Sequence, residues 1–285
     1  MAVKKFSDLF AFDLDGTLVH GLPSGERGIP PALLKVVHKL ADRAAIVVAT
    51  GRRYRSAYPD ILTLPKMPYS ILHNGLVIKD QKGKTIFRRE LSTKNALVIS
   101  KILEKKNVDF FFSTDAHEKK IDFIFLKNSL ENSASLQTVY ERTKGVNRVF
   151  KTLDDLIHFK AAPLVEITSV APHKELLKIQ KSISRLLPRP YRVLVVKNIG
   201  FSKYGALEIF PKTCSKWTGI EFVRKRLGAR RVIAVGDDEN DMEMIKSAHI
   251  GLVMSHAQPH VKAVSQKHIK GHEGLRTYLK EFYSL

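Results

Sequence analysis

The chain has 285 residues, of which 44% are apolar and 27% are charged. These values are ordinary for a soluble globular protein of up to two domains, and they exclude a collagen-like, disulfide-scaffold or wholly disordered chain. Lysine and arginine total 48 against 28 aspartates and glutamates, a formal net charge of +20. Such an excess attracts anions of any kind, although an ordinary solvated surface explains it equally well.

The sequence offers no sign of a membrane segment or a secretion signal. The longest uninterrupted apolar run, Ala44 to Ala49, is far shorter than the roughly 20 residues that span a bilayer. After Lys4 and Lys5, aspartates from Asp8 onward interrupt the apolar stretch that a signal peptide requires. The single cysteine, Cys214, forms no internal disulfide. We therefore expect a cytoplasmic protein.

The first part of the chain predicts a strand–helix–strand unit. Leu9 to Leu14 is typical of a buried parallel strand that ends in a turn, and Pro30-Pro31 opens an amphipathic helix. Ala45 to Ala49 is a second buried strand, which a right-handed crossover places parallel to the first. A third strand, Ser70 to Leu72, is stopped by the turn residues His73-Asn74-Gly75.

The middle of the chain departs from this pattern. Adjacent strands are predicted over 108–113 and 121–126, after a helix over 94–106. Further strands are predicted over 163–170, 191–196 and 206–210, with a helix over 172–187. Paired strands with intervening helices indicate an inserted α+β domain. We place this cap, which should set substrate specificity, at 79–197, between core segments 1–78 and 198–285.

In the last part of the chain, predicted helices and strands alternate again. A helix over 218–227 precedes a buried strand over 232–235, and the acidic segment Gly236 to Asp241 follows at once. A helix over 242–248 and a strand over 250–254 come next. The core is therefore predicted to be α/β, a Rossmann-like, doubly wound parallel sheet with helices on both faces.

Polar residues follow three of these strands: Asp13 and Asp15, Thr50, and Asp237 with Asp241. Because ligands bind at the carboxyl ends of strands in an open α/β sheet, we expect these side chains to converge. Two close carboxylates repel, which favours a bound cation or a raised pKa, and Mg²⁺ prefers oxygen ligands of this kind. An isolated Asp-x-Asp, however, more often caps a turn.

The order of these motifs resembles the haloacid dehalogenase (HAD) superfamily of phosphatases. Asp13 to Thr17 after a buried strand is similar to its first motif, and Thr50 in Ala-Thr-Gly-Arg to its second. Lys216 is similar to the third motif and Gly236 to Asp241 to the fourth. The large insert between the second and third motifs and the Asn74-Gly75 turn resemble the Cof-type branch.

The resemblance implies a Mg²⁺-dependent phosphoric monoester hydrolase. Asp13 would be the nucleophile that forms an aspartyl-phosphate, and Asp15 the general acid and base. Mg²⁺ would be held by Asp13, Asp237 and the backbone carbonyl of Asp15. Lys216 would neutralise charge between the nucleophile and the phosphoryl oxygens.

Further roles follow from the same resemblance. The phosphate-binding residues would be Leu14 through its backbone N–H, Thr50, Gly51, Lys216 and Asn240. Asp241 would orient Lys216 or a metal-bound water. Arg52 and Asn74 are candidate substrate contacts, although an exposed arginine and a turn residue explain them equally well.

Three functions remain open at this point. The first is hydrolysis of a small phosphorylated metabolite, sugar phosphates foremost; the second is a hexose phosphate phosphomutase; the third is a non-catalytic polyanion or nucleic-acid binding protein. No tail or block concentrates the basic residues, which argues against a dedicated basic arm for nucleic acid but leaves a folded basic patch open. Phe110 to Phe112 is expected to be a cap strand packed on both faces rather than a base-stacking platform. The physiological substrate and the oligomeric state do not follow from the sequence.

Overall fold

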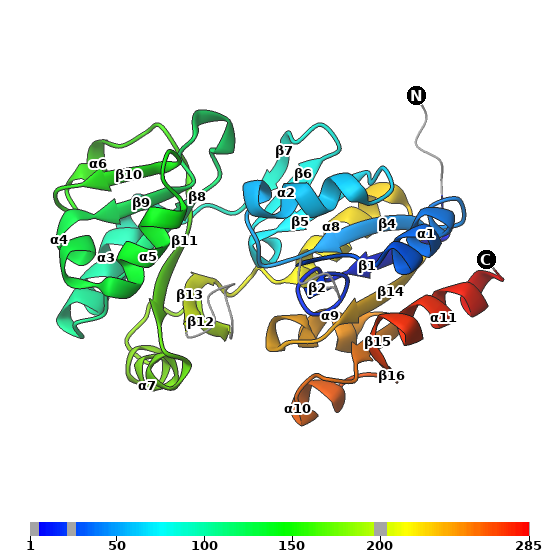
Figure 1. Ribbon diagram of the computed structural model, residues 1–285. Coiled ribbons are helices and arrows are strands. Elements are labelled where there is room, and N and C mark those ends of the chain that lie inside the picture. Colours follow the sequence, from blue (N-terminus) through cyan, green and yellow to red (C-terminus); the bar gives the residue numbers. More distant parts are fainter. Residues whose placement is uncertain (1–5, 22–26, 197–203, 285) are drawn as a thin grey trace. The chain divides into compact units, whose positions relative to one another are not determined.

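The computed structural model describes residues 6–21, 27–196 and 204–284. They fall into two compact units (Figure 1). The first unit takes in the chain up to residue 88 and from residue 214 onward, and the second runs from residue 89 to residue 213. No helix in the described ranges is long and apolar enough to cross a membrane.

One eight-stranded sheet forms the centre of the first unit. Its strands are β1 (Asp8–Phe12), β4 (Ala45–Ala49), β5 (Tyr69–Leu72), β6 (Val77–Asp80), β7 (Thr85–Arg88), β14 (Arg231–Gly236), β15 (Ile250–Met254) and β16 (Lys267–Ile269). Their order is β16-β15-β14-β1-β4-β5-β6-β7. Neighbours are parallel from β16 to β5, whereas β6 and β7 extend the edge antiparallel. A separate antiparallel pair joins β2 (His20–Gly21) to β3 (Arg27–Gly28).

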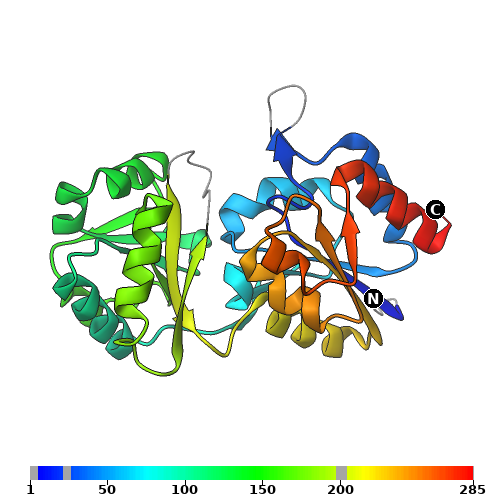
Figure 2. The same ribbon diagram turned by 90° about the horizontal axis from the view of Figure 1, so that it is seen from below.

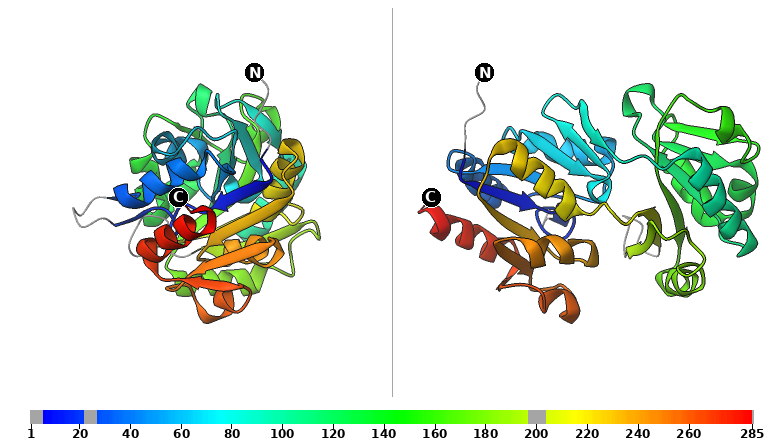
Figure 3. Two further views of the ribbon diagram at one scale, coloured as in Figure 1. Left: turned by 90° about the vertical axis from the view of Figure 1, so that its right-hand side faces the viewer. Right: turned by 180° about the vertical axis from the view of Figure 1, so that it is seen from behind.

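Helices cover both faces of this sheet. They are α1 (Pro31–Leu40), α2 (Tyr54–Thr63), α8 (Lys216–Leu227), α9 (Met242–Ser247), α10 (Pro259–Lys262) and α11 (Gly271–Tyr283), with 3₁₀ turns η1 (His73–Gly75) and η3 (Glu239–Asp241). Helices α1 and α11 pack together on one face, and α8 and α9 on the other (Figures 2 and 3).

Strand β1 is central because both of its faces are apolar. All five of its residues are buried, between β14 on one side and β4 on the other. Leu9 and Ala11 belong to the core on the α8 and α9 face, whereas the Phe10 ring meets Phe282 of α11, 5.5 Å away between ring centroids. Alternating side chains of a strand point to opposite faces, so this pattern fits a strand covered on both sides. The next residue, Asp13, therefore emerges at the carboxyl edge of the sheet.

The second unit has its own sheet. Its strands are β8 (Phe111–Thr114), β9 (Phe123–Leu126), β10 (Asn147–Phe150), β11 (Leu164–Ala171), β12 (Tyr191–Val196) and β13 (Gly205–Pro211). Their order is β10-β9-β8-β11-β13-β12, antiparallel except for β9 with β10. Its helices are α3 (Thr93–Lys105), α4 (Lys127–Asn132), α5 (Ala134–Arg142), α6 (Asp155–His158) and α7 (His173–Ile183), with the 3₁₀ turn η2 (His117–Lys119).

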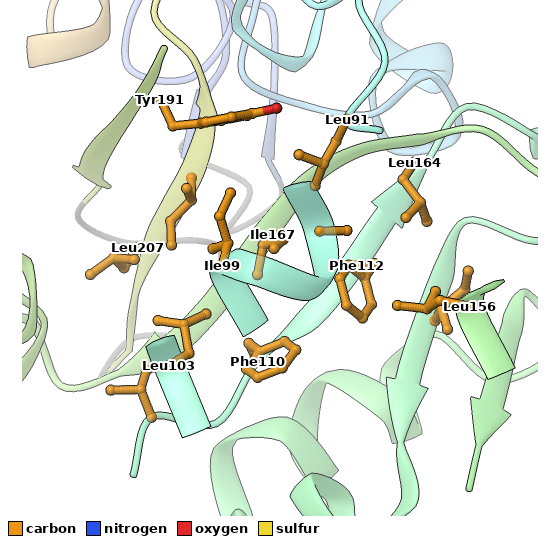
Figure 4. Packing of buried hydrophobic residues seen from close by; sticks show 14 of the residues in the cluster. Leu91, Ile99, Leu103, Phe110, Phe112, Leu156, Leu164, Ile167, Tyr191 and Leu207 are labelled. Atoms are coloured by element: carbon orange, nitrogen blue, oxygen red, sulfur yellow. The ribbon is translucent and has the colours of Figure 1, made fainter. Parts of the chain in front are cut away.

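Two apolar clusters hold the second unit together. Phe110 and Phe112 pack in the larger one, where Figure 4 shows Ile99 and Leu103 of α3 beside them. Phe111 points to the opposite side and belongs to the smaller cluster. The three consecutive phenylalanines thus fill both faces of one sheet, as the sequence predicted.

The predicted fold class is confirmed: a mostly parallel α/β core carries an inserted α+β domain. The limits of the insert lie later in the chain than the predicted 79–197. Strands β6 and β7 continue the first sheet because β6 pairs with β5, and β13 belongs to the second sheet because it pairs with β11 and β12. The predicted junction at 197/198 lies outside the described residues.

Candidate active site

Asp13 is held at the carboxyl end of β1. Its backbone N–H donates to the carbonyl of Val235 at 2.9 Å, which continues the β1–β14 ladder by one residue. Its side chain is almost fully buried. A buried carboxylate must be paired or hydrogen-bonded, so its partners define the site.

The partner of Asp13 is Lys216, the first residue of α8. Its Nζ donates to Asp13 Oδ1 at 2.6 Å and to Asp241 Oδ1 at 2.7 Å, and the side chain is 1% exposed. Ser215 caps this helix, since its Oγ accepts from the N–H of Thr218 at 3.2 Å. The cap fixes where α8 begins, and the fixed helix start places the ammonium between the two carboxylates.

Both carboxylate oxygens of Asp241 accept hydrogen bonds from groups of the protein. Besides Lys216, it accepts from the backbone N–H groups of Asp237 and Asp238 at 2.9 and 3.1 Å. Gly236 makes room for it, because a Cβ there would lie 2.5 Å from Asp241 Cβ. With these bonds satisfied, Asp241 orients Lys216 and the loop after β14.

Asp237 is positioned by two further side chains. Thr17 Oγ1 donates to its Oδ1 at 2.9 Å, and His256 Nε2 lies 3.2 Å from its Oδ2. The carboxylate passes over Gly16, whose φ of +86° and missing Cβ allow the close approach. The loop after β1 and the loop after β14 are thereby locked together.

The charges of this cluster are unbalanced. Burial raises the pKa of Asp13 well above its usual value, and the ammonium of Lys216 offsets only part of that shift. Burial, with the nearby charge of Asp241, raises the pKa of Asp237 to about 7. Burial alone would lower the pKa of Lys216, but the two carboxylates that it contacts outweigh this and raise it. Lys216 therefore stays an ammonium ion among three carboxyl groups, which favours a further cation.

The donor set suits a hard divalent cation. Asp13, Asp237 and Asp241 each offer a carboxylate oxygen within 4.8 Å of the others. All three are oxygen donors, as Mg²⁺ prefers. Asp241 already accepts three hydrogen bonds, from Lys216 and from two backbone N–H groups, which is more than Asp13 or Asp237 accepts. Asp13 and Asp237 are therefore the residues that fit a metal ion best.

The segment after β4 carries Thr50, Gly51 and Arg52. Thr50 is buried, and its Oγ1 accepts from the N–H of Arg52 at 3.1 Å. Arg52 binds Asp15 with Nε and Nη2, each at 2.5 Å, and Asp60 of α2 with Nη1 at 2.6 Å. Arg52 thereby anchors Asp15, and its predicted contact with substrate stays a prediction.

The two asparagines of the predicted site meet each other. Asn240 Nδ2 donates to Asn74 Oδ1 at 3.0 Å, and the N–H of Asn74 donates to the Thr50 carbonyl at 3.1 Å. Asn74 adopts a left-handed conformation with φ of 52°, which this residue type tolerates. A Cβ on Gly51 would lie 3.2 Å from Asn74 Oδ1 and 3.6 Å from Asn240 Nδ2, so the three loops converge here.

Leu14 lies in the apolar core, unlike the polar residues of the predicted site. Its side chain is fully buried, while its carbonyl accepts from the N–H groups of Leu18 and Val19 at 3.0 and 2.7 Å. These bonds close the turn after Asp13. Its expected part in phosphate binding, through the backbone N–H, stays a prediction.

Three residues of the site were not identified from the sequence. Thr17 belongs to the first motif. Its hydroxyl donates to the carboxylate of Asp237, and the need to orient this carboxylate could have indicated such a role. His256 follows β15, and its neighbour His260 faces Glu239 at 3.3 Å instead of the site. Arg27 of β3 contacts Asp15, and no local pattern around it indicates this.

Comparison with known proteins agrees with this geometry. Residues 10–273 match the family model described as haloacid dehalogenase-like hydrolase. An HMP-PP phosphatase of Serratia proteamaculans is 28% identical over 268 residues, which cover 93% of this chain and 90% of that protein. A haloacid dehalogenase-like hydrolase from Bacteroides thetaiotaomicron has a TM-score of 0.73 at 20% identity, over 98% of this chain and 100% of the other. A HAD subclass IIB sugar phosphatase has a TM-score of 0.70 at 17% identity, over 98% and 100%. The two structures share the fold.

Proposed function

This chain belongs to the haloacid dehalogenase-like hydrolase family, and we propose that it is a Mg²⁺-dependent phosphatase of small phosphorylated metabolites. The observation that carries the proposal is the buried contact of Lys216 with both Asp13 and Asp241, next to Asp237. Groups with these charges, at this edge of the sheet, suit in-line attack on a phosphoryl group.

In the proposed reaction, Asp13 attacks phosphorus and forms an aspartyl-phosphate. Its Oδ1 is engaged by Lys216 at 2.6 Å, so the carboxylate has a fixed orientation. The ammonium also lies beside the position that the phosphoryl oxygens would take, where it offsets negative charge in the transition state. Water then attacks phosphorus and releases phosphate and the free Asp13 carboxylate.

Asp15 is proposed to protonate the leaving oxygen and later to deprotonate the attacking water. It stands two residues after Asp13, and its side chain is 40% exposed. Arg52 holds both of its oxygens, which orients the carboxylate as a base. One of these bonds has to open when Asp15 carries the proton as the acid. A positioned general acid and base of this kind contributes about 10²- to 10⁴-fold to the rate.

Asp13, Asp237 and the backbone carbonyl of Asp15 are the groups proposed to hold Mg²⁺. The bound ion would supply positive charge beside the phosphoryl oxygens. Thr17 fixes Asp237 for this task, and the absence of a side chain at Gly16 gives it space.

Small phosphorylated metabolites are the proposed substrates, with sugar phosphates as the class to test first. Support comes from the compared proteins, one named as an HMP-PP phosphatase and one as a sugar phosphatase. The second unit, residues 89–213, is proposed to select among substrates, as the insert of the Cof-type branch does.

Phosphate release from an aryl phosphate, with and without Mg²⁺, tests this function. Asp13→Asn should lower kcat at least about 10³-fold, because an amide is a poor nucleophile and loses the charge that faces Lys216. Asp42→Asn is the matched control, an exposed aspartate of the same unit, and should keep wild-type activity. Full activity of Asp13→Asn would contradict the proposed nucleophile.

A further inference from the structure

Two arginines from different segments meet at Asp15. Arg52, which follows β4, grips both carboxylate oxygens with a guanidinium fork. Arg27, on the short strand β3, reaches Oδ1 of the same carboxylate. A single carboxylate is therefore bound by two positive charges next to the proposed nucleophile.

The two guanidinium groups differ in how much of their hydrogen-bonding capacity is used. Arg52 is 17% exposed, and it also binds Asp60 at 2.6 Å and the Ser56 carbonyl at 3.2 Å. Arg27 is 50% exposed, and within the described residues the structure records only Asp15 as its partner. Because a guanidinium has five N–H donors, Arg27 keeps donors for a further acceptor besides Asp15.

We propose that Arg27 binds a second anionic group of the substrate, beyond the oxygen that leaves, so that the enzyme favours organic diphosphates and similar dianionic compounds over simple phosphomonoesters. This inference rests on the proposed function. Arg27 is suited to this task because a guanidinium recognises phosphate and carboxylate through paired N–H donors. Its place against Asp15, the proposed acid for the leaving oxygen, puts it on the leaving-group side of the scissile bond.

With a diphosphate monoester, the reaction balances without a further reactant. An Asp13 oxygen forms a bond to the terminal phosphorus, and the bond from that phosphorus to the bridging oxygen breaks. The electron pair stays on the bridging oxygen, which departs as part of a phosphate monoester. Arg27 would then face the negative charge that develops on this leaving group. Water afterwards cleaves the aspartyl-phosphate and releases inorganic phosphate.

The test compares minimal substrates that differ in one anionic group. Methyl phosphate has a neutral leaving group, methyl diphosphate adds a phosphate, and 2-phosphoglycolate adds a carboxylate. For each, kcat/KM is measured in the wild type, Arg27→Gln, Arg27→Lys and the control Arg43→Gln, which removes an exposed arginine of the same unit. The preference is the kcat/KM for the substrate with the added anionic group divided by the kcat/KM for methyl phosphate. Dividing each variant's preference by that of the wild type cancels the higher intrinsic reactivity of the diphosphate.

Arg27→Gln should reduce the preference for the added anionic group by about 10- to 100-fold, the effect expected of a charge-assisted hydrogen bond. Arg27→Lys should keep part of it, and Arg43→Gln all of it. If the preference falls for methyl diphosphate, Arg27 binds the added phosphate; if it falls for 2-phosphoglycolate, Arg27 binds the carboxylate. An unchanged preference in Arg27→Gln for both substrates would overturn the inference.

A binding measurement separates this inference from the proposed function. Calorimetry with methylenediphosphonate, which the enzyme does not cleave, should show binding about tenfold or more weaker in Arg27→Gln than in the wild type. Binding of inorganic phosphate should change much less. If no substrate releases phosphate, the proposed function fails while this comparison still tests Arg27. Equal methylenediphosphonate affinity in both proteins would refute the anion site.

Discussion

At the scale of single residues, Gly16 shows how the site depends on a missing side chain. Its φ is +86°, and a Cβ there would overlap the carboxylate of Asp237. Gly16→Ala should therefore push Asp237 aside and weaken Mg²⁺ binding by about 10- to 100-fold, as loss of a supporting residue at a metal site does. Magnesium titration by calorimetry measures this.

Gly145 provides the matched control for that substitution. Its φ is +87°, so alanine meets the same backbone strain, but among the described residues no atom beyond its chain neighbours lies within 4 Å of its Cβ position. Gly145→Ala should lower stability without changing Mg²⁺ affinity. If both variants bind Mg²⁺ like the wild type, Gly16 does not serve to make room for Asp237.

The titration of Asp237 predicts how stabilisation by Mg²⁺ depends on pH. Burial raises its pKa to about 7 in the metal-free protein. A raised carboxyl pKa stabilises the fold at low pH, and this stability is lost as pH rises through about 7. A bound cation favours the ionised form. The increase in Tm on adding Mg²⁺ should therefore be larger at pH 8 than at pH 6. Asp237→Asn should show a smaller pH dependence but not lose it, because the pKa of Asp13 is raised as well. An equal increase at both pH values in the wild type would contradict the assignment.

At the scale of elements, Asp8 joins β1 to two other segments. It accepts from Arg231 of β14 at 2.9 and 2.7 Å, and Tyr283 of α11 also donates to it. Burial raises the pKa of Asp8, but the bonds from Arg231 and Tyr283 outweigh it, so the net shift is downward. Asp8→Asn should lower the free energy of unfolding by about 1.5–3 kcal/mol at neutral pH.

Acid should remove this contribution. A lowered carboxyl pKa gives stability that is fully present above about pH 4 and disappears as pH falls through the lower value of the folded state. Urea unfolding of the wild type and Asp8→Asn, compared between pH 7 and pH 3, measures the difference. A difference that grows toward low pH would contradict the role of the ionised carboxylate.

The elements that the sequence predicted well are those whose apolar pattern continues over the whole element. Buried strands such as β1 and β4 read as short apolar runs, and the polar residues after them mark the site. Helix α2 was missed because Pro59 lies inside it and only Ala57 is buried. The ion pair between Asp60 of this helix and Arg52 was therefore not predicted either.

Contacts between distant segments could not be predicted in the same way. Arg27 and Asp15 are 12 residues apart and meet only because β2 pairs with β3. His256 and Asp237 meet because β14 and β15 are neighbours in the sheet. Neither contact leaves a periodic signal, since each depends on strand order rather than on local pattern.

At the scale of the whole molecule, the two units should respond separately to mutation because each has its own core. Ile167 is fully buried in the second unit, and the single tryptophan, Trp217, lies in the first. Ile167→Ala should destabilise the second unit by about 2–5 kcal/mol. Hydrogen exchange should then speed up across β8, β11 and β13 but not across β1 and β4.

Val47→Ala, at a fully buried position of the first unit, should give the reverse pattern and lower the urea midpoint seen by Trp217 fluorescence. Equal effects of both substitutions on exchange in both units would show that the chain unfolds as one cooperative body.

The central claim is that Asp13 carries the phosphoryl group during turnover. Borohydride added during turnover with Mg²⁺ reduces an aspartyl-phosphate to homoserine, which peptide mass spectrometry locates in the chain. We predict homoserine at position 13, dependent on substrate and absent from Asp13→Asn. Homoserine at another aspartate, or none at any position while phosphate is being released, would contradict the account.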